Sequence, residues 1–139
     1  MARLVTITAP DALLLDTTVF SYFLKRDHPR ARAYQPHVEG QLLAVSFVTV
    51  GELYRGAFQA KWGQARLNEM EARLSKVVHL PFHEQVAIHW ARIQTAVRGR
   101  PFPVNDAWIA ACAMTYDCMV VSDDHVFAAI PGLRVLPIP

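Results

Sequence analysis

Short runs of apolar residues recur along this chain, separated by longer segments that carry apolar residues at helical spacing. The runs are ALLLD at 12–16, QLLAVS at 41–46, KVVHL at 76–80, CMVVS at 118–122 and RVLPI at 134–138. Runs with so little polar alternation are typical of parallel strands, which helices cover on both faces. Because strands alternate with helices, we expect a three-layer α/β fold with a central parallel sheet of about five strands.

The segments between these runs predict the helices. They are TTVFSYFLKR at 17–26, a piece punctuated by Pro29 and Pro36, FVTVGELYRGAFQAKW at 47–62, residues 64–76, a segment with Val86, Trp90, Ile93 and Val97 on one face, and PFPVNDAWIAACA at 101–113. Thr17 or Thr18 suits the N-cap of the first, and Ser46 suits the N-cap of the third. Gly99 and Pro101 predict the end of the fifth.

The length and composition limit the class of protein. We expect one domain over residues 1–139, because this length suits a single domain. No apolar run approaches the roughly 18 residues of a membrane span, and MARLVTITAP lacks the features of a secretory signal. We therefore expect a cytoplasmic protein without a membrane segment. Cys112 and Cys118 match no zinc or redox spacing, so we expect buried free thiols.

Four acidic residues are predicted to lie at one edge of the sheet. Asp16 ends the first run, and Asp124 follows the fourth. Glu52 lies one to two turns into the helix after the second run, and Asp106 opens the helix that leads to the fourth. Each acid alone is explained by a helix cap, a helix dipole, solvent exposure or a turn. Together they lie where open α/β sheets bind ligands, which indicates a functional site.

The chemistry of such a site follows from its charge. Crowded carboxylates repel each other, and a divalent cation removes that conflict. Because the ligands are oxygen atoms, with no Cys or His spaced for a tetrahedral site, we expect Mg²⁺, with Mn²⁺ as the other ion that these donors accept. An ion of this kind supports attack of water on a phosphodiester. The sequence therefore predicts metal-dependent hydrolysis of a nucleic acid.

Four motifs contain these acids, in the order LLLDTTVF, SFVTVGELYRGA, VNDAWIAACA and VVSDDHVFAAIPGL. In these motifs the chain resembles the PIN-domain ribonucleases, most closely the VapC-type toxins of bacterial and archaeal toxin–antitoxin systems. The resemblance implies a PIN-like, Rossmann-like domain with Mg²⁺-dependent endoribonuclease activity. It also implies that the catalytic and metal-binding residues are Asp16, Glu52, Asp106 and Asp124. Of these, Asp16 and Asp106 are the firmest ligands.

The resemblance also indicates supporting residues and a preferred fourth acid. The supporting residues are Ser122, Asn105 and Thr17. Ser122 matches a hydroxyl that supports the pocket, and Asn105 is expected to orient the third acid. The adjacent Asp123 and Asp124 leave the fourth acid open. Asp124 is preferred because it lies two positions after Ser122 and three before Phe127. The first ten residues have no expected role.

Basic residues near the acids are candidates for binding RNA phosphates. The candidates are Lys25, Arg26, Arg98 and Arg100, with Arg30 and Arg32 close to the first two. Each of them can equally well solvate the end of a helix. Arg55 is spaced to pair with Glu52 instead of a phosphate. His125, beside Asp124, is the one histidine with a candidate supporting role.

The resemblance implies two protein partners. One is an antitoxin whose C-terminal segment covers the acidic groove, and the other is a second toxin subunit. We expect a homodimer that binds an amphipathic antitoxin segment along the first and third helices. The aromatic candidates for that contact are Tyr22, Phe23, Tyr54, Phe58 and Trp62.

Two other functions fit parts of the sequence. A phosphatase or phosphotransferase with an aspartyl nucleophile would use an acid such as Asp16 at the end of a strand. Such enzymes carry a second acid two residues later, where this chain has Thr18. The other alternative is a catalytically inactive PIN-fold binding module. Cleavage of RNA, compared with hydrolysis of a generic phosphoester, distinguishes these functions.

Overall fold

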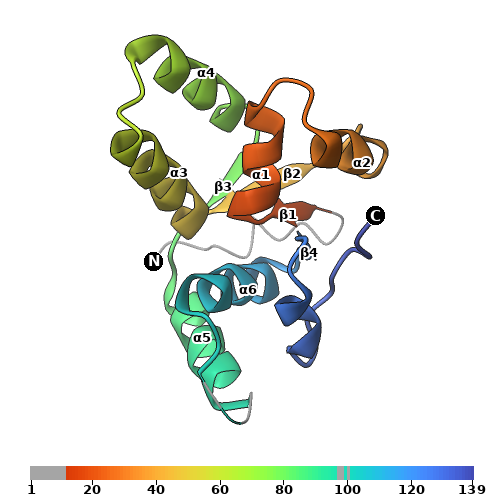
Figure 1. The fold of residues 1–139 in the computed structure, drawn as a ribbon. Coiled ribbons are helices and arrows are strands. Elements are labelled where there is room, and N and C mark those ends of the chain that lie inside the picture. The colour runs from red at the N-terminus through yellow and green to blue at the C-terminus, as the bar shows by residue number, and fades with distance from the viewer. Residues whose placement is uncertain (1–11, 97–98, 100) are drawn as a thin grey trace.

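The computed structural model describes residues 12–96, 99 and 101–139. In this part of the chain one sheet contains four parallel strands in the order β3-β2-β1-β4 (Figure 1). The strands are β1 (Leu13–Leu15), β2 (Leu43–Ser46), β3 (Val78–Leu80) and β4 (Met119–Val121). The predicted parallel sheet is therefore confirmed, and β1 and β2 are its central strands.

The expected fifth strand, RVLPI, is reduced to a single bridge. Val135 bridges Val120 in the parallel sense. The Val120 amide donates to the Arg134 carbonyl, and the Leu136 amide donates to the Val120 carbonyl, each at 2.9 Å. No further backbone hydrogen bond of this ladder is found after Leu136 in the described part of the chain. Among the described residues the sheet therefore has four strands instead of about five.

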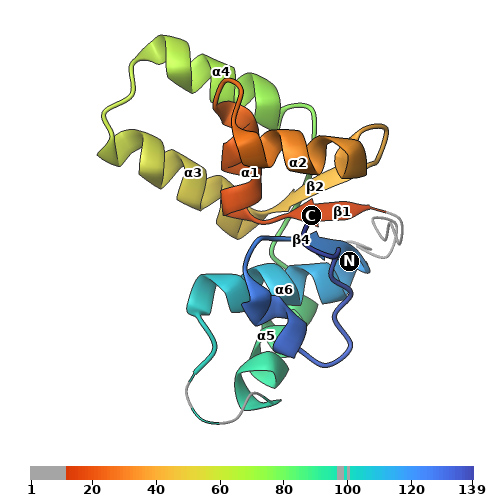
Figure 2. The ribbon, with the colours of Figure 1, turned by 45° about the vertical axis from the view of Figure 1, so that its right-hand side comes forward.

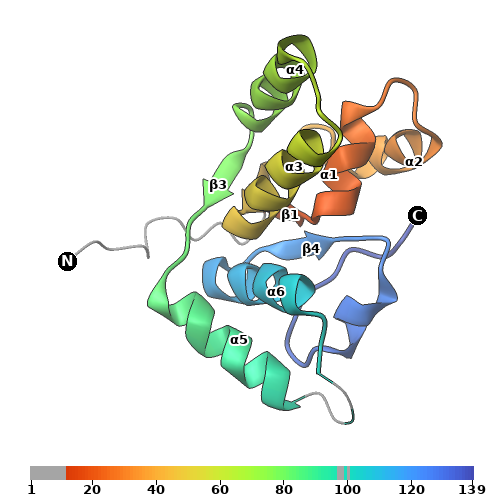
Figure 3. The same cartoon turned by 60° about the vertical axis from the view of Figure 1, so that its left-hand side comes forward.

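The helices form layers on the two faces of the sheet (Figures 1 and 2). On one face lie α1 (Thr17–Leu24), α2 (Pro29–Val38), α3 (Phe47–Gln59) and α4 (Gln64–Leu74). On the other lie α5 (Glu84–Ala96) and α6 (Val104–Tyr116), followed after β4 by the short 3₁₀ helix η2 (His125–Ala129). Figure 3 shows this separation clearly. The predicted helices are confirmed, although Val97 lies outside the described residues.

The apolar strands are explained by two hydrophobic cores, one on each face. Side chains alternate between the faces of a strand, so β1, β2 and β4 each contribute to both cores, whereas β3 contributes to one. The core beneath α1–α4 takes Leu13, Leu15, Val45 and Val121 from the strands. The core against α5 and α6 takes Leu14, Ala44, Leu80 and Val120. All eight are buried, which is why the runs show little polar alternation.

α6 is the most deeply buried helix of the site. Ala107 and the four residues at 110–113 have no exposed surface, and their small side chains let the helix pack closely against the sheet and α5. Cys112 and Cys118 are buried free thiols, as predicted. No helix within the described ranges is long and apolar enough to cross a membrane. The close packing of α6 gives the acid in its first turn, Asp106, a rigid support.

Candidate active site

Asp16 directly follows β1 and is only 6% exposed. Its Oδ1 accepts a hydrogen bond from the Val19 amide at 2.8 Å and so caps α1, which makes the predicted caps Thr17 and Thr18 wrong. Its Oδ2 accepts from the Ser122 hydroxyl at 2.5 Å, a contact that fits the supporting role expected of Ser122. Burial raises the pKa of Asp16, and the two hydrogen bonds oppose that rise. The carboxylate is therefore held in one orientation.

Glu52 connects the helices that meet at this edge of the sheet. Its Oε1 accepts from the Thr17 hydroxyl of α1 at 2.6 Å, and its Oε2 accepts from the Asn105 amide of α6 at 3.1 Å. The Thr17 hydroxyl also lies 3.0 Å from the hydroxyl of Thr49, one turn before Glu52. Asn105 therefore contacts the second acid, whereas the sequence suggested that it orients the third. Through these contacts α1, α3 and α6 hold one carboxylate together.

Asp106 lies in the first turn of α6 and is partly buried. Burial raises its pKa most, and the negative charges of the other three acids add to the rise, to about 6 from an ordinary value of 3.8. In decreasing order of influence these charges are Asp124, Asp16 and Glu52. The structure therefore brings the other three predicted acids within electrostatic range of Asp106.

The neighbouring residues Asp123 and Asp124 have different surroundings. Asp124 is exposed, and its Oδ1 accepts from the Val126 amide at 3.0 Å, which caps η2. Its own amide donates to the Ser122 hydroxyl at 2.9 Å, so the same hydroxyl touches Asp16 and positions Asp124. Asp124 is also the acid with the largest electrostatic influence on the pKa of Asp106. This geometry favours Asp124 as the fourth acid of the site.

Asp123 is instead enclosed by side chains of α1 and α2. Its carboxylate accepts from the Tyr22 hydroxyl at 2.8 Å, from the Tyr34 hydroxyl at 2.6 Å, and from Arg30 Nε and Nη2 at 3.1 and 2.5 Å. The hydrogen bonds from Arg30 do most to lower the pKa of the Asp123 carboxyl group, which falls to about 2. Asp123 therefore anchors the turn that carries Asp124 and leaves no oxygen free for a ligand.

The sequence did not predict that Tyr22, Arg30 and Tyr34 bind the carboxylate of Asp123. They lie 89 to 101 positions away along the chain, so no local pattern connects them with the turn after β4. From the sequence, Arg30 is a candidate for binding RNA phosphates and not a partner of Asp123. The adjacent acids themselves were the one available signal, since two carboxylates in sequence need separate partners.

The basic residues divide into paired and unpaired groups. Arg30 pairs with Asp123, and Arg32 pairs with Asp27. Lys25 and Arg26 are exposed, and the ion pairs found among the described residues do not include them. Arg98 and Arg100 lie outside the described residues, so their predicted contacts with RNA stay predictions.

Two further candidates are exposed. No ion pair between Arg55 and Glu52 is found in the described part of the chain, and Arg55 faces solvent. His125 is the first residue of η2 and is exposed as well. Neither contributes a contact to the four acids.

The donor atoms of this edge suit a hard divalent cation. All four acids offer carboxylate oxygens. Burial and the charges of the other three acids all raise the pKa of Asp106, as expected where negative charges have no compensating positive charge. Within the described ranges no three His, Cys, Asp or Glu side chains are arranged to hold one ion between them. Magnesium does not require such a cage, because it keeps several water ligands and binds through one or two carboxylates. The residues present therefore fit Mg²⁺.

Known proteins share both this sequence pattern and this fold. The PIN domain family model matches residues 13–133. Ribonuclease VapC4 of Mycobacterium tuberculosis is 30% identical over 130 residues, which are 90% of this chain and 95% of that protein. The solved structure of VapBC-5 from the same organism is 31% identical, covers 91% of this chain and 97% of its own, and has a TM-score of 0.62. The structure of VapBC-1 from nontypeable Haemophilus influenzae is 25% identical, covers 90% of this chain and 96% of its own, and has a TM-score of 0.75. This chain therefore belongs to the PIN-domain family and, within it, to the VapC group.

Proposed function

We propose that this protein is an Mg²⁺-dependent endoribonuclease and the toxin of a toxin–antitoxin pair. The observation that carries the proposal is the gathering of four carboxylates at one edge of the sheet, where burial and then the charges of the other three acids raise the pKa of Asp106 to about 6. The relative VapC4, which matches 90% of this chain, is a ribonuclease. The Asp106→Asn variant described in the Discussion tests the activity directly.

Asp16 and Asp106 would hold the metal ion, and Glu52 and Asp124 would complete the site directly or through water. Mn²⁺ would suit the same oxygen donors. When bound, the ion polarises the phosphate and lowers the pKa of the water that attacks the phosphodiester.

The protein itself contributes orientation and charge. Ser122 and the Val19 amide hold both oxygens of Asp16, so this carboxylate needs little reorganisation when a cation binds. Thr17 and Asn105 hold Glu52 in the same way. Asp106 has a pKa of about 6 and loses its proton near neutral pH, where it can act as a ligand. These contacts prepare the edge of the sheet to receive a cation and a phosphate.

The two alternative functions are less well supported. An aspartyl phosphatase needs an acid two residues after Asp16, and Thr18 occupies that position with its side chain exposed. The family assignment also points away from that class. An inactive binding module has no need for four acids in one site. It would show no RNA cleavage with Mg²⁺ or Mn²⁺.

Magnesium is expected to raise the melting temperature of the protein, and to raise it more at about pH 7.5 than at about pH 5, because a protonated carboxyl group does not bind the ion. Asp106, with a pKa of about 6, is largely protonated at the lower pH. Without metal the folded protein holds this proton more tightly than the unfolded chain does. The stability of the metal-free protein therefore falls as the pH rises through about 6. Thermal melts with and without the ion measure both effects.

A matched pair of variants controls this measurement. Asp16→Asn should reduce the gain from Mg²⁺, whereas Asp117→Asn, at the far end of α6, should keep it. At about 100 times the dissociation constant the parent should gain about 2.7 kcal/mol. A melting curve that millimolar Mg²⁺ leaves unchanged at both pH values would remove the support for a metal site.

We also propose that an antitoxin segment binds between α1 and α3. VapBC-5 is a member of the VapBC family of toxin–antitoxin systems. A cavity of about 290 Å³ lies between these helices. Leu24, Leu53 and Trp62 are among its apolar lining, and its charged lining consists of Glu52, Lys25 and Arg66. An amphipathic segment can place apolar side chains along the cavity and a basic side chain near Glu52. Of the five aromatic candidates, Trp62 is the one that lines this cavity.

Trp62→Ala is expected to weaken binding of the cognate antitoxin by about 30-fold or more, because buried aromatic anchors dominate such interfaces. Phe58→Ala is the matched control, since Phe58 lies near the end of α3, four positions before Trp62, but is 64% exposed and does not line the cavity. Calorimetric titration with the antitoxin, after circular dichroism has established that both variants fold, measures the difference. Equal affinities for the two variants would contradict this placement of the antitoxin.

The homodimer stays a prediction, and an exposed apolar patch supports it. Phe82 and Val104 are 56% and 57% exposed, and Phe82 packs edge-on against Phe47 and Trp108. Exposed apolar side chains such as Phe82, packed beside the partly buried rings of Phe47 and Trp108, are typical of protein interfaces. Light scattering should give twice the 15.6 kDa mass of the chain, and a Phe82→Glu variant should be monomeric. A monomeric parent protein would contradict the prediction.

A further inference from the structure

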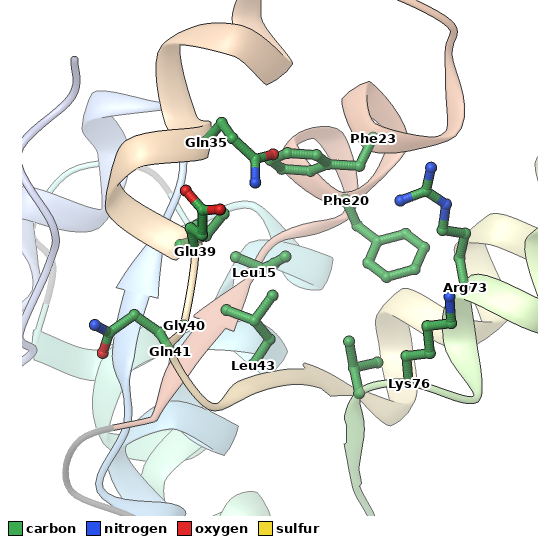
Figure 4. A pocket seen from close by; sticks show the side chains of 12 residues that line it. Leu15, Phe20, Phe23, Gln35, Glu39, Gly40, Gln41, Leu43, Arg73 and Lys76 are labelled. Atoms are coloured by element: carbon green, nitrogen blue, oxygen red, sulfur yellow. The ribbon is translucent and has the colours of Figure 1, made fainter.

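Two adjoining pockets lie at the side of α1 that faces α4. The first has a volume of about 340 Å³ and lies between α1, the end of α2, the strands β1 and β2, and the end of α4 (Figure 4). The second has a volume of about 380 Å³ and lies between the end of α1 and α4. Phe23, Arg73 and Lys76 line both pockets, so the two form one continuous depression.

The second pocket is strongly basic. Its charged residues are Lys25, Arg26, Arg73, Lys76 and Glu69. The four basic side chains thus face one acid, and the ion pairs found among the described residues include none of them. Fourteen Lys and Arg residues are present in the whole chain, so four in one pocket is a marked concentration. Such a surface attracts phosphate groups.

The first pocket has an apolar floor and a polar rim. Leu15, Phe20 and Leu43 lie at its floor, and Arg73 and Lys76 lie together on the α4 side (Figure 4). The remaining polar lining, on the opposite side, consists of Gln35, Glu39 and Gln41. The amide groups can donate and accept hydrogen bonds with the edge of a base, and the floor can contact its face. The volume is within the range of pockets that hold small ligands.

These pockets are connected with the catalytic edge. Lys25 and Leu24 line the second pocket and also the cavity that contains Thr17 and Glu52. The connecting helix α1 has eight residues and therefore spans about 12 Å. A single strand of a few nucleotides can cover that distance. A polyanion bound at the acids can thus continue along α1 into the basic pocket.

We propose that this depression binds a nucleotide of single-stranded RNA that flanks the cleavage position. Lys25, Arg26, Arg73 and Lys76 bind its phosphates, and the first pocket receives its base. The proposal rests on the proposed ribonuclease function and adds a binding site remote from the four acids. RNA fits better than an acidic peptide, because the pocket pair joins a phosphate-binding surface to an apolar site of base size and leads to the catalytic edge.

Binding of RNA to the catalytically impaired Asp106→Asn protein tests the phosphate contacts. A long single-stranded RNA should bind more tightly than a short one, and Arg73→Ala or Lys76→Ala should remove most of that advantage. Each of these changes should also lower the salt dependence of binding, by about 0.7 in the slope of log K against log salt concentration. The control is Arg92→Ala, an exposed arginine of α5 on the other face of the sheet. It should keep both the length advantage and the slope.

A scan of abasic positions along the long RNA tests the base pocket. One position, away from the cleavage position, should lose about fivefold or more in affinity when its base is removed. An equal length advantage in Arg73→Ala, Lys76→Ala and Arg92→Ala, or no sensitive position in the scan, overturns the proposal. If Arg73→Ala and Lys76→Ala weaken binding of the antitoxin but not binding of RNA, the depression binds a protein partner, and the proposal is overturned as well. A parent protein that neither binds nor cleaves RNA overturns the proposed function itself.

Discussion

Replacing Asp106 by asparagine is expected to lower the rate of RNA cleavage by about 100-fold or more, because even the loss of a group that only supports a metal ligand costs 10- to 100-fold. The amide keeps the volume of the side chain and removes one charge from the site. It also removes the carboxyl group whose pKa is raised to about 6, most by burial and then by the charges of the other three acids. Initial rates with a labelled single-stranded RNA and Mg²⁺ measure the effect.

The matched control carries the same substitution at the other end of the same helix. Asp117 is the C-cap of α6, adopts a φ of 59° and pairs with Arg134 on the surface. Asparagine tolerates this left-handed backbone conformation well, so Asp117→Asn should fold and cleave RNA like the parent. Circular dichroism should show that both variants keep the native fold. An Asp106→Asn variant as fast as the parent would exclude the proposed active site.

Replacing Asp123 by alanine is expected to lower the free energy of unfolding by about 2–4 kcal/mol, because hydrogen bonds with charged groups contribute about 1.5–3 kcal/mol and buried unpaired polar groups are costly. Four hydrogen bonds end at this carboxylate. Tyr34 is fully buried, and its hydroxyl would lose its partner. The side chains of Arg30 and Asp123 are 33% and 25% exposed, so solvent screening keeps the effect below that of a fully buried pair. Urea denaturation measures the change.

Asp124→Ala is the natural comparison, since it removes the same charge one position later. It should abolish most RNA cleavage while costing about 1 kcal/mol of stability, the typical contribution of a helix cap. The two variants are thus expected to separate stability from activity. If Asp123→Ala cost the activity and left stability unchanged, the fourth acid would have to be reassigned to Asp123.

The contribution of Asp123 also has a defined pH dependence. The pKa of this group falls from 3.8 to about 2 in the folded protein. Its stabilising effect is therefore fully present above about pH 4 and is lost as the pH falls through about 2. Asp106 behaves in the opposite way, because its pKa is raised, and it destabilises the metal-free protein as the pH rises through about 6.

The positions of the four acids could be predicted because they depend on local patterns. A buried strand has a recognisable apolar run, and its last residue marks the edge at which the acid lies. Asp16 and Asp124 follow such runs, and Glu52 and Asp106 lie in helices whose starts are also visible in the sequence. Since all strands are parallel, their carboxyl ends meet at one edge without further information.

The hydrogen-bond partners could not be predicted in the same way. Asn105 binds Glu52, 53 positions away, instead of orienting the neighbouring Asp106. Asp16 caps α1 itself, so neither Thr17 nor Thr18 has that role. In each case several neighbouring side chains could make the same hydrogen bond. Which of them makes it depends on the distances between side chains in the packed helices.

The α/β class, the parallel sheet and the edge that carries the acids are predictable from the sequence alone, because they follow from the periodicity and order of local segments. The different surroundings of Asp123 and Asp124 are visible only in the tertiary structure. Asp123 is held by Arg30, Tyr22 and Tyr34, which reach it only because α1 and α2 pack on the same face of the sheet beside the end of β4. Asp124 lies outside that cluster, and its charge acts on Asp106. The spacing of the motif also favours Asp124, but it contains no information on the partners that hold Asp123, because these lie 89 to 101 positions away along the chain.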